Sequence, residues 1–206
     1  MIGNKYSSVF EGKLQENLSL RNVKDGWKEV KKGKDVVLYT TKYQNFDVKL
    51  AKIEATAAVN IEKASAYYFD NLDGQKQCRD MCDKLIKLET VDQDTVVTLF
   101  KTKSKFLVSS REVVGVQHRR KINENEYLIT RDCIEEHPNA PKSKDVVRAE
   151  GKFYAIFLTK INENTTKFEM YMLLDPKGNI PTSVVNSLIE EQHETVIKDI
   201  EMIKKM

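Results

Sequence analysis

The chain has 206 residues with 34 basic and 31 acidic side chains, which gives a formal net charge of +3. This balance argues against nucleic-acid binding, which needs a concentrated basic stripe. No window reaches the ~18 apolar residues that span a bilayer, and the N-terminus has no apolar signal core. Three cysteines without framework spacing indicate reduced thiols. We expect one cytoplasmic domain over residues 1–206, without a cofactor or metal.

The N-terminal quarter predicts one helix and two strands. Residues 6–20 carry apolar side chains at helical spacing, which is typical of an amphipathic helix. Two strand-like runs follow at 36–43 and 48–59, joined by a short polar turn. In the second run the apolar face changes to Lys and Glu, and this slip of phase predicts a bulge or a strand end near Ala51.

The middle of the chain changes from helical to strand periodicity. Asn60 can cap a helix that begins beside it, and a second short helix is expected over 75–83. After Leu85 the sequence is almost continuously strand-like, with polar turns between the runs. These runs are residues 85–91, 95–102, 112–122, 126–134, 146–161 and 166–174.

Two segments near the C-terminus differ from this pattern. Connector 135–145 contains two prolines and no apolar side chain larger than that of Ala140, and loops of this kind are more often functional than idle. From Pro181, apolar residues recur every three or four positions for about 25 residues, a helix about 38 Å long. A helix of this length is expected to lie across something large and apolar.

The order of these elements predicts an α+β fold. Consecutive antiparallel strands joined by tight turns form a twisted, curved sheet, and one long helix crosses the hollow of that curve. The space between helix and sheet is either filled by side chains or occupied by a ligand.

Alternation along 166–174 places Met170 and Met172 on one face with Phe168 and Leu174. Methionines there suit a wall that adapts to flexible acyl chains, or they merely fill gaps in the core.

Polar candidates for the interior lie on other strands. Gln117 shares a face with Val113, and Asp132 shares a face with Ile134. Burying such groups without partners costs roughly 1–3 kcal/mol each. They therefore either face the polar head of a ligand or pair with each other or with Arg79.

Four segments resemble the START (StAR-related lipid transfer) domain family, in order and along essentially the whole chain. They are SSREVVGVQHRR at 109–120, VVRAEGKF at 146–153, DPKGNIPTSVVN at 175–186 and GWKEVKKGKDVVLYT at 26–40. The first departs from the family pattern, with Glu112 for an Asp and Val113 for an aromatic residue. The resemblance implies a helix-grip fold, in which the helix over 181–205 closes a lipid tunnel and loop 135–145 gates it.

The resemblance also indicates ligand positions. The acid and arginine of sterol-binding members correspond here to Phe100 and Gln117, so sterol is not favoured. The positions used for phosphatidylcholine correspond to Gln75 and Arg79, and Arg79 pointing inward would favour an anionic phosphate. Ceramide-binding positions correspond to Phe100, Asp132 and Met170. The predicted ligand-binding residues are Arg79, Phe100, Gln117, Asp132, Met170, Met172, Val185, Leu188 and Ile189.

The resulting hypothesis is a monomeric, non-catalytic carrier of one lipid, most simply a phospholipid, that contacts membrane surfaces transiently. A sterol or ceramide carrier and an interaction module with a vestigial pocket are alternatives. A helix-grip enzyme of the cyclase or hydrolase type is another, but His118, His137 and His193 do not supply an obvious catalytic group.

Overall fold

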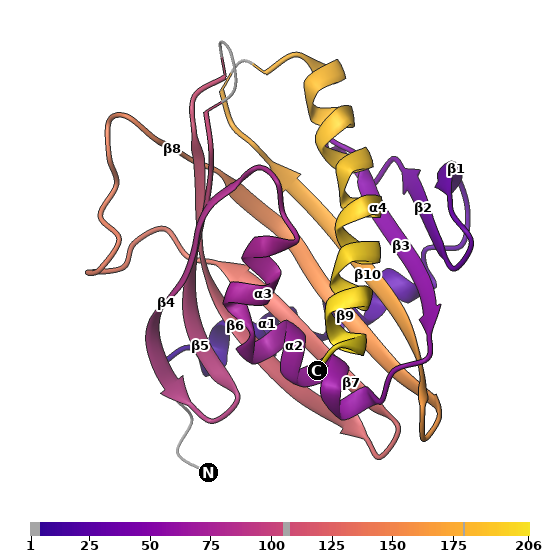
Figure 1. Cartoon of the computed structure of the whole chain (residues 1–206). Helices are drawn as coiled ribbons and strands as arrows, with labels where there is room; N and C mark the ends of the chain where they lie inside the picture. Colours follow the sequence, from indigo (N-terminus) through magenta and orange to yellow (C-terminus); the bar gives the residue numbers. More distant parts are fainter. Residues whose placement is uncertain (1–4, 105–107, 179) are drawn as a thin grey trace.

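The computed structural model describes residues 5–104, 108–178 and 180–206. One sheet of ten strands carries helices on both faces (Figure 1). The helices are α1 Ser7–Ser19, α2 Ile61–Asp70, α3 Leu72–Gln77 and α4 Thr182–Lys204, with a 3-10 turn at Leu20–Asn22. The strands are β1 Lys28–Lys32, β2 Val36–Thr41, β3 Leu50–Ala57, β4 Cys82–Asp92, β5 Thr95–Thr102, β6 Arg111–Asn123, β7 Glu126–Cys133, β8 Val147–Arg148, β9 Glu150–Asn162 and β10 Thr165–Asp175.

The sheet is antiparallel throughout its main path, with the order β1-β2-β3-β10-β9-β7-β6-β5-β4. The short strand β8 lies off this path and pairs in parallel with β6. Most neighbours in the order are also neighbours in sequence, because turns such as 123–125 and 162–164 join them directly. At the centre of the sheet β3 lies beside β10, so that the three N-terminal strands join the later strands through the last strand of the chain.

The inner face of the sheet is the face that α2, α3 and α4 cover. Phe168 and Met170 of β10, Ile156 of β9 and Ile53 of β3 point to this face and pack with Tyr68 of α2. The side chains of the C-terminal part of α4 complete the same cluster. The predicted inward alternation of Phe168 and Met170 is therefore confirmed.

The outer face is covered by α1. The strand residues between the inward-facing ones, such as Phe157 and Tyr171, point to this outer face. There they pack with Leu14, Leu18 and Leu20. Contact between so apolar a sheet face and water is unfavourable, and the amphipathic helix α1 removes that contact by covering the face. The sheet is thus a middle layer with a distinct helix layer on each side.

Asn60 caps α2 as expected, because its Oδ1 accepts hydrogen bonds from the backbone N–H groups of Glu62 (2.8 Å) and Lys63 (3.3 Å). The second short helix was predicted wrongly over 75–83, since α3 ends at Gln77 and β4 begins at Cys82. Asn71 accounts for the earlier start, because its side chain accepts from Gly74 N and so caps α3.

Of the two alternatives predicted near Ala51, the strand end is found, because β3 begins at Leu50, whereas β3 pairs with both β2 and β10 without a bulge. Lys52 stays in phase because it points to the outer face. There its Nζ lies 4.8 Å from the ring centroid of Trp27 and 4.7 Å from that of Tyr39. Cation–π contacts of this kind make a lysine compatible with an aromatic surface.

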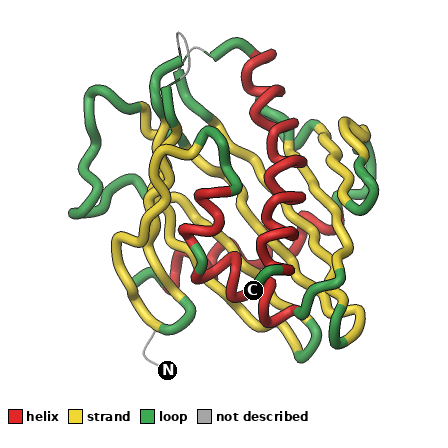
Figure 2. The backbone as a smooth tube through the Cα atoms, viewed as in Figure 1, coloured by secondary structure: helices red, strands yellow, loops and turns green. Residues whose placement is uncertain are grey.

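Loop 135–145 does not lie beside α4. His137 Nε2 is 3.0 Å from Glu89 Oε2, and Ala140 is buried against the outer sides of β5 and β6. Figure 2 shows this loop projecting at the left of the view, away from α4. The prediction that it gates the lid together with that helix is therefore wrong, because hydrogen bonds and the Ala140 contact hold it on β4–β6.

The turn before α4 contacts a different segment. Arg111 Nε donates to Pro176 O at 3.3 Å, and its Nη2 donates to Lys177 O at 3.2 Å. Gly178 in this turn has a φ of +73°, a left-handed conformation that favours glycine. Asn179, within the family-like segment 175–186, lies outside the described residues. Residues 1–4, at the N-terminus that lacks an apolar signal core, lie outside them too.

The inner core should tolerate truncation poorly. Phe168→Ala removes a fully buried ring that meets Tyr68 edge-on at a centroid distance of 6.3 Å, and we expect a loss of about 3–5 kcal/mol in the free energy of unfolding. Ile161→Ala is the control, since that side chain is 57% exposed. Urea unfolding measures both, and similar midpoints for the two variants would contradict this assignment of the core.

Candidate functional site

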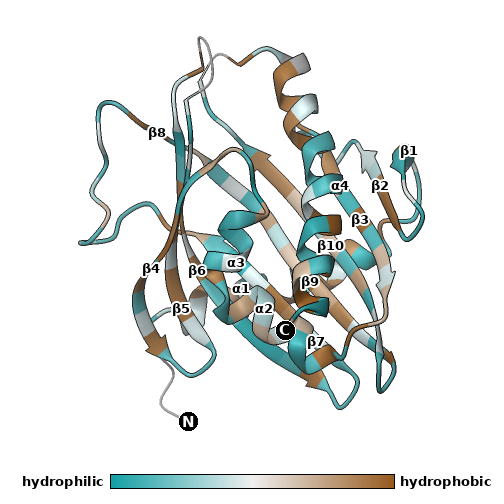
Figure 3. Cartoon of the chain, viewed as in Figure 1, coloured by the Kyte–Doolittle hydropathy of each residue, from teal (hydrophilic) through white to brown (hydrophobic). Residues whose placement is uncertain are grey.

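Helix α4 has two differently packed halves. From His193 onward, the inward-facing residues His193, Val196, Ile200 and Ile203 are buried. In the preceding turns, residues 184–192, no described side chain is fully buried, although several are apolar. Figure 3 shows hydrophobic colouring on the first turns of α4 and on stretches of the strands behind it. The sheet therefore grips only the C-terminal half of the helix tightly.

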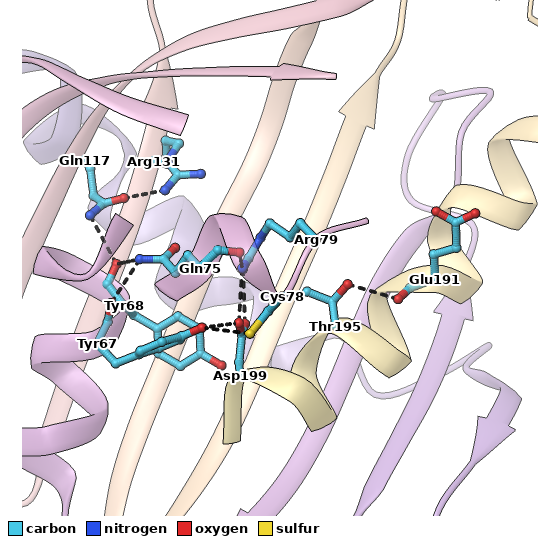
Figure 4. Close-up of polar contacts among 10 residues, drawn as sticks. All are labelled: Tyr67, Tyr68, Gln75, Cys78, Arg79, Gln117, Arg131, Glu191, Thr195 and Asp199. Carbon is cyan, nitrogen blue, oxygen red and sulfur yellow. Dashed lines mark hydrogen bonds and ion pairs between the residues drawn. The ribbon is translucent and has the colours of Figure 1, made fainter. Parts of the chain in front are cut away.

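A buried ion pair holds this C-terminal half. Arg79 Nη1 and Nη2 lie 3.1 Å from the two carboxylate oxygens of Asp199, and the Tyr67 hydroxyl donates to Asp199 Oδ1 at 2.5 Å (Figure 4). Asp199 has no exposed surface. Burial alone would lower the pKa of Arg79, but attraction to Asp199 outweighs it and raises that pKa. The pair joins the α3 region and α2 to α4.

A second contact reaches α4 from the first hairpin. The His193 ring Nε2 lies 3.1 Å from Val36 O, and Lys31 Nζ lies 2.7 Å from Glu194 Oε1. A Cβ placed on Gly33 would be 3.2 Å from the His193 ring, so the hairpin approaches the helix more closely than a larger residue would allow. The C-terminal half of α4 is thus held on two sides.

A polar chain crosses the inner face of β6 and β7. Gln117 Nε2 donates to Tyr68 O and Phe69 O at 3.2 and 3.0 Å, where α2 ends, and its Oε1 accepts from Arg131 Nη2 at 2.5 Å (Figure 4). Gln117 is therefore inward-facing, as expected. Its amide is fully used in capping α2 and holding Arg131.

A half-buried apolar surface lies on the inner face, near the loosely packed half of α4. It consists of side chains that point inward or toward the sheet but are not sealed by neighbours. We call this set the open inner surface, and it comprises Phe100, Tyr154, Met172, Val185, Leu188 and Ile189.

Several predicted ligand-binding residues belong to this region. Met172, Val185, Leu188, Ile189 and Phe100 are part of the open inner surface itself. Met170 lies deeper and is buried in the inner core. Met172 and Ile189 pack against the inner core, and the contact of any of these residues with a ligand stays a prediction.

Asp132 was placed on the wrong face. It lies on the outer face beneath α1, where Lys13 Nζ is 3.6 Å from its Oδ1 and its Oδ2 is buried without a partner among the described residues. The shared face with Ile134 was correctly inferred, but Ile134 itself packs on the outer side. Burial raises the pKa of the Asp132 carboxyl more than Lys13 lowers it. Asp132 cannot contact a ligand on the inner face.

Arg79 reaches the interior, but its charge is neutralised by Asp199 and is not available as predicted. On its outer side lies an open surface depression of about 700 Å³, lined by charged and polar residues such as Lys76, Asp80 and Lys103. This polar lining does not suit an acyl chain.

Two interior residues escaped sequence reasoning. Asp199 appeared as one more polar position on an amphipathic helix, and its partner is 120 residues away. Arg131 could have been found from the alternation of 126–134, which places it on one face with Ile129 and opposite Asp132.

The sequence matches the START domain over residues 9–203. The chain belongs to the START domain family. It is 24% identical over 182 residues to the mitochondrial steroidogenic acute regulatory protein of Danio rerio, which covers 86% of this chain but only 63% of that relative's length. The resemblance inferred from the four sequence segments is thereby confirmed.

Solved structures show the same fold. Human StAR-related lipid transfer protein 5 aligns with a TM-score of 0.83 at 16% identity, covering 97% of this chain and 96% of the other. Human STARD10 aligns with a TM-score of 0.81 at 16% identity, covering 100% of this chain and 81% of the other. The predicted helix-grip fold is confirmed, and lipid binding and transfer is the general activity of the family.

No helix in the described part of the chain is long and apolar enough to cross a membrane. No group of three or more His, Cys, Asp or Glu side chains there is arranged to hold a metal ion.

Removing the buried carboxylate should destabilise the protein strongly. Asp199→Asn leaves Arg79 buried without its counter-charge, and we expect a loss of about 3–5 kcal/mol in the free energy of unfolding. Asp80→Asn is the matched control, because its pair with Lys198 is exposed and its loss should leave the midpoint unchanged. Equal effects in urea unfolding would show that the Asp199 pair does not hold α4.

Asp132 should make stability depend on pH in the opposite sense from a paired carboxylate. Its folded pKa is raised, so the folded state binds this proton more tightly and the charged form is unfavourable at neutral pH. Asp132→Asn should therefore be more stable than the parent protein at pH 7, and the difference should shrink as the pH falls towards about 4. Thermal unfolding from pH 7 to 4 checks this, and a less stable variant at pH 7 would mean that Lys13 outweighs burial.

Proposed function

We propose that the protein binds one lipid, a phospholipid, against the open inner surface and carries it between membranes without covalent chemistry. It acts as a monomer in the cytoplasm, and its contact with membranes is transient. The observation that carries this proposal is that apolar side chains on the inner face of the sheet and on the first turns of α4, the open inner surface, remain half-buried.

Acyl chains suit this surface for an energetic reason. Each methylene group moved out of water contributes roughly 0.8 kcal/mol to the binding free energy. Two acyl chains would therefore bind favourably against this lining and would cover its exposed apolar surface. The unbranched side chain of Met172 is flexible enough to follow chains of different length and unsaturation. A rigid ligand would need a more closely fitted wall.

Polar groups of the inner face favour a phosphate over a hydroxyl. The position that corresponds to the arginine of sterol-binding members is Gln117, and its amide is occupied by α2 carbonyls and Arg131. It has no free donor to offer a sterol or ceramide hydroxyl. A guanidinium on the same face supports an anionic group instead.

Transfer requires that the lipid enter and leave, and the unequal packing of α4 supports a route. The half of the helix before His193 can move while the half held by Asp199 and His193 stays in place. The sequence predicted a lid over 181–205, and the moving part of that lid is now its first turns alone. Its neighbour is the segment at 109–111 in place of loop 135–145, because Arg111 contacts the turn before α4.

A charge placed in the lining should block lipid transfer. Ile189→Glu puts a carboxylate against the inner surface, and we expect transfer of a fluorescent phospholipid between vesicles to fall at least about tenfold, because desolvating that charge costs several kcal/mol. Ser187→Glu, on the exposed side of the same turn, is the matched control and should transfer normally.

Native mass spectrometry of the parent protein gives an independent readout. A bound phospholipid after purification supports the proposal. A parent protein that carries no lipid and moves none between vesicles would overturn it.

A further inference from the structure

Arg131 is a cation on the inner face without a matching anion. It lies on β7 with Ile129, and Ile129 is fully buried in the inner cluster. The described residues offer Arg131 no ion pair with an Asp or Glu. Of its five N–H donors, one on Nη2 bonds Gln117, while Nε is buried without any hydrogen-bond partner.

Asp199, the buried carboxylate on α4, is already paired with another guanidinium. Both oxygens of Asp199 are held by Arg79, and one of them also accepts from Tyr67. Burial lowers the pKa of Arg131, and the positive charge of Arg79 acts in the same direction. The interior therefore holds two guanidinium groups and one carboxylate in this region, an excess of one positive charge.

Arg131 is also held in a fixed orientation. Its guanidinium carbon lies 4.8 Å from the ring centroid of Tyr154, and Gln117 fixes one edge of the group from β6. A guanidinium fixed on one edge and one face can present its remaining N–H groups to a ligand with little loss of side-chain entropy. Tyr154 belongs to the open inner surface, so the cation and the apolar lining are adjacent.

Arg131 is partly buried, and its Nε is fully buried. A guanidinium in such a position without a counter-charge is unfavourable, and an anionic ligand would compensate it. A phosphate ester supplies what is missing, since its anionic oxygens accept from several N–H groups at once. A neutral hydroxyl would leave the charge uncompensated.

We propose that Arg131 binds the phosphate of the phospholipid, with the head group directed into the protein and the acyl chains along the open inner surface. This inference rests on the proposed function and adds its ligand class and its recognition residue. Arg131, and not Arg79, then separates phospholipids from diacylglycerols, sterols and ceramides. Arg79 has a structural role through Asp199.

The test compares two lipids that differ only in the phosphate head group. Fluorescent phosphatidylcholine and diacylglycerol with the same acyl chains are transferred between neutral vesicles by the parent protein and by Arg131→Gln. We expect phosphatidylcholine transfer to fall about 10–100-fold in the variant, the range for loss of one or two charged hydrogen bonds. Diacylglycerol transfer should stay the same or rise.

Three controls keep the outcome interpretable. Arg131→Lys retains the charge and should keep the preference for phosphatidylcholine. Arg120→Gln removes a guanidinium from the outer face of the neighbouring strand, where it pairs with Glu11, and should change neither rate. Circular dichroism confirms that each variant is folded.

The two proposals fail separately. A parent protein that transfers neither lipid overturns the proposed function. A parent protein that transfers phosphatidylcholine, with Arg131→Gln doing so equally well, overturns only the role of Arg131. Inorganic phosphate alone is the last arm. A parent protein that transfers no phosphatidylcholine but is thermally stabilised by millimolar phosphate, while Arg131→Gln is not, would point to a free-phosphate site and overturn the lipid source.

Discussion

The contact between Arg79 and Asp199 is the constraint on which the arrangement of the interior depends. Asp199 lies without exposed surface in the last half of α4, and only the bidentate arginine and the Tyr67 hydroxyl make its charge tolerable there. The same contact fixes the end of α3, because Arg79 Nη1 also donates to Gln75 O. Three helices are therefore tied to one carboxylate.

This tie divides the molecule into a fixed part and an adaptable part. The fixed part contains α2, α3 and the helix from His193 onward, packed on β2, β3, β9 and β10. The adaptable part is the first turns of α4 above the half-buried side chains of the sheet. A carrier needs both properties, since the fixed part preserves the fold while the adaptable part accepts ligands of different shape.

The sequence predicted the helices and strands better than it predicted which face of the sheet each side chain occupies. Alternation correctly grouped Met170 with Met172, since a strand has only two faces and both residues share one. The same rule grouped Asp132 with Ile134 but could not say which face α1 would cover, so Asp132 was placed in the interior. One additional observation, that Ile129 packs in the inner cluster, reverses that assignment and brings Arg131 inward.

Contacts between distant segments were beyond sequence reasoning for a physical reason. The partner of Arg79 and the position of loop 135–145 depend on how the sheet curves, and curvature is the sum of small twists over ten strands. Periodicity predicted the long helix and element order predicted the curved sheet, and the family resemblance added the helix-grip arrangement with its gating loop. It misassigned the loop because His137 and Ala140 attach this one to the outer sides of β4–β6.

The abrupt change in packing at His193 also has a kinetic consequence. Unwinding the turns before it exposes little surface, whereas releasing the turns after it requires opening the buried core. Backbone amides of 186–192 should therefore exchange their hydrogens by a local opening that hardly responds to urea, because urea sensitivity scales with the surface exposed. Amides from Val196 to Ile203 should exchange only with global unfolding. The rate at which the protein opens would then be separable from its overall stability, so that a substitution could change one and leave the other untouched.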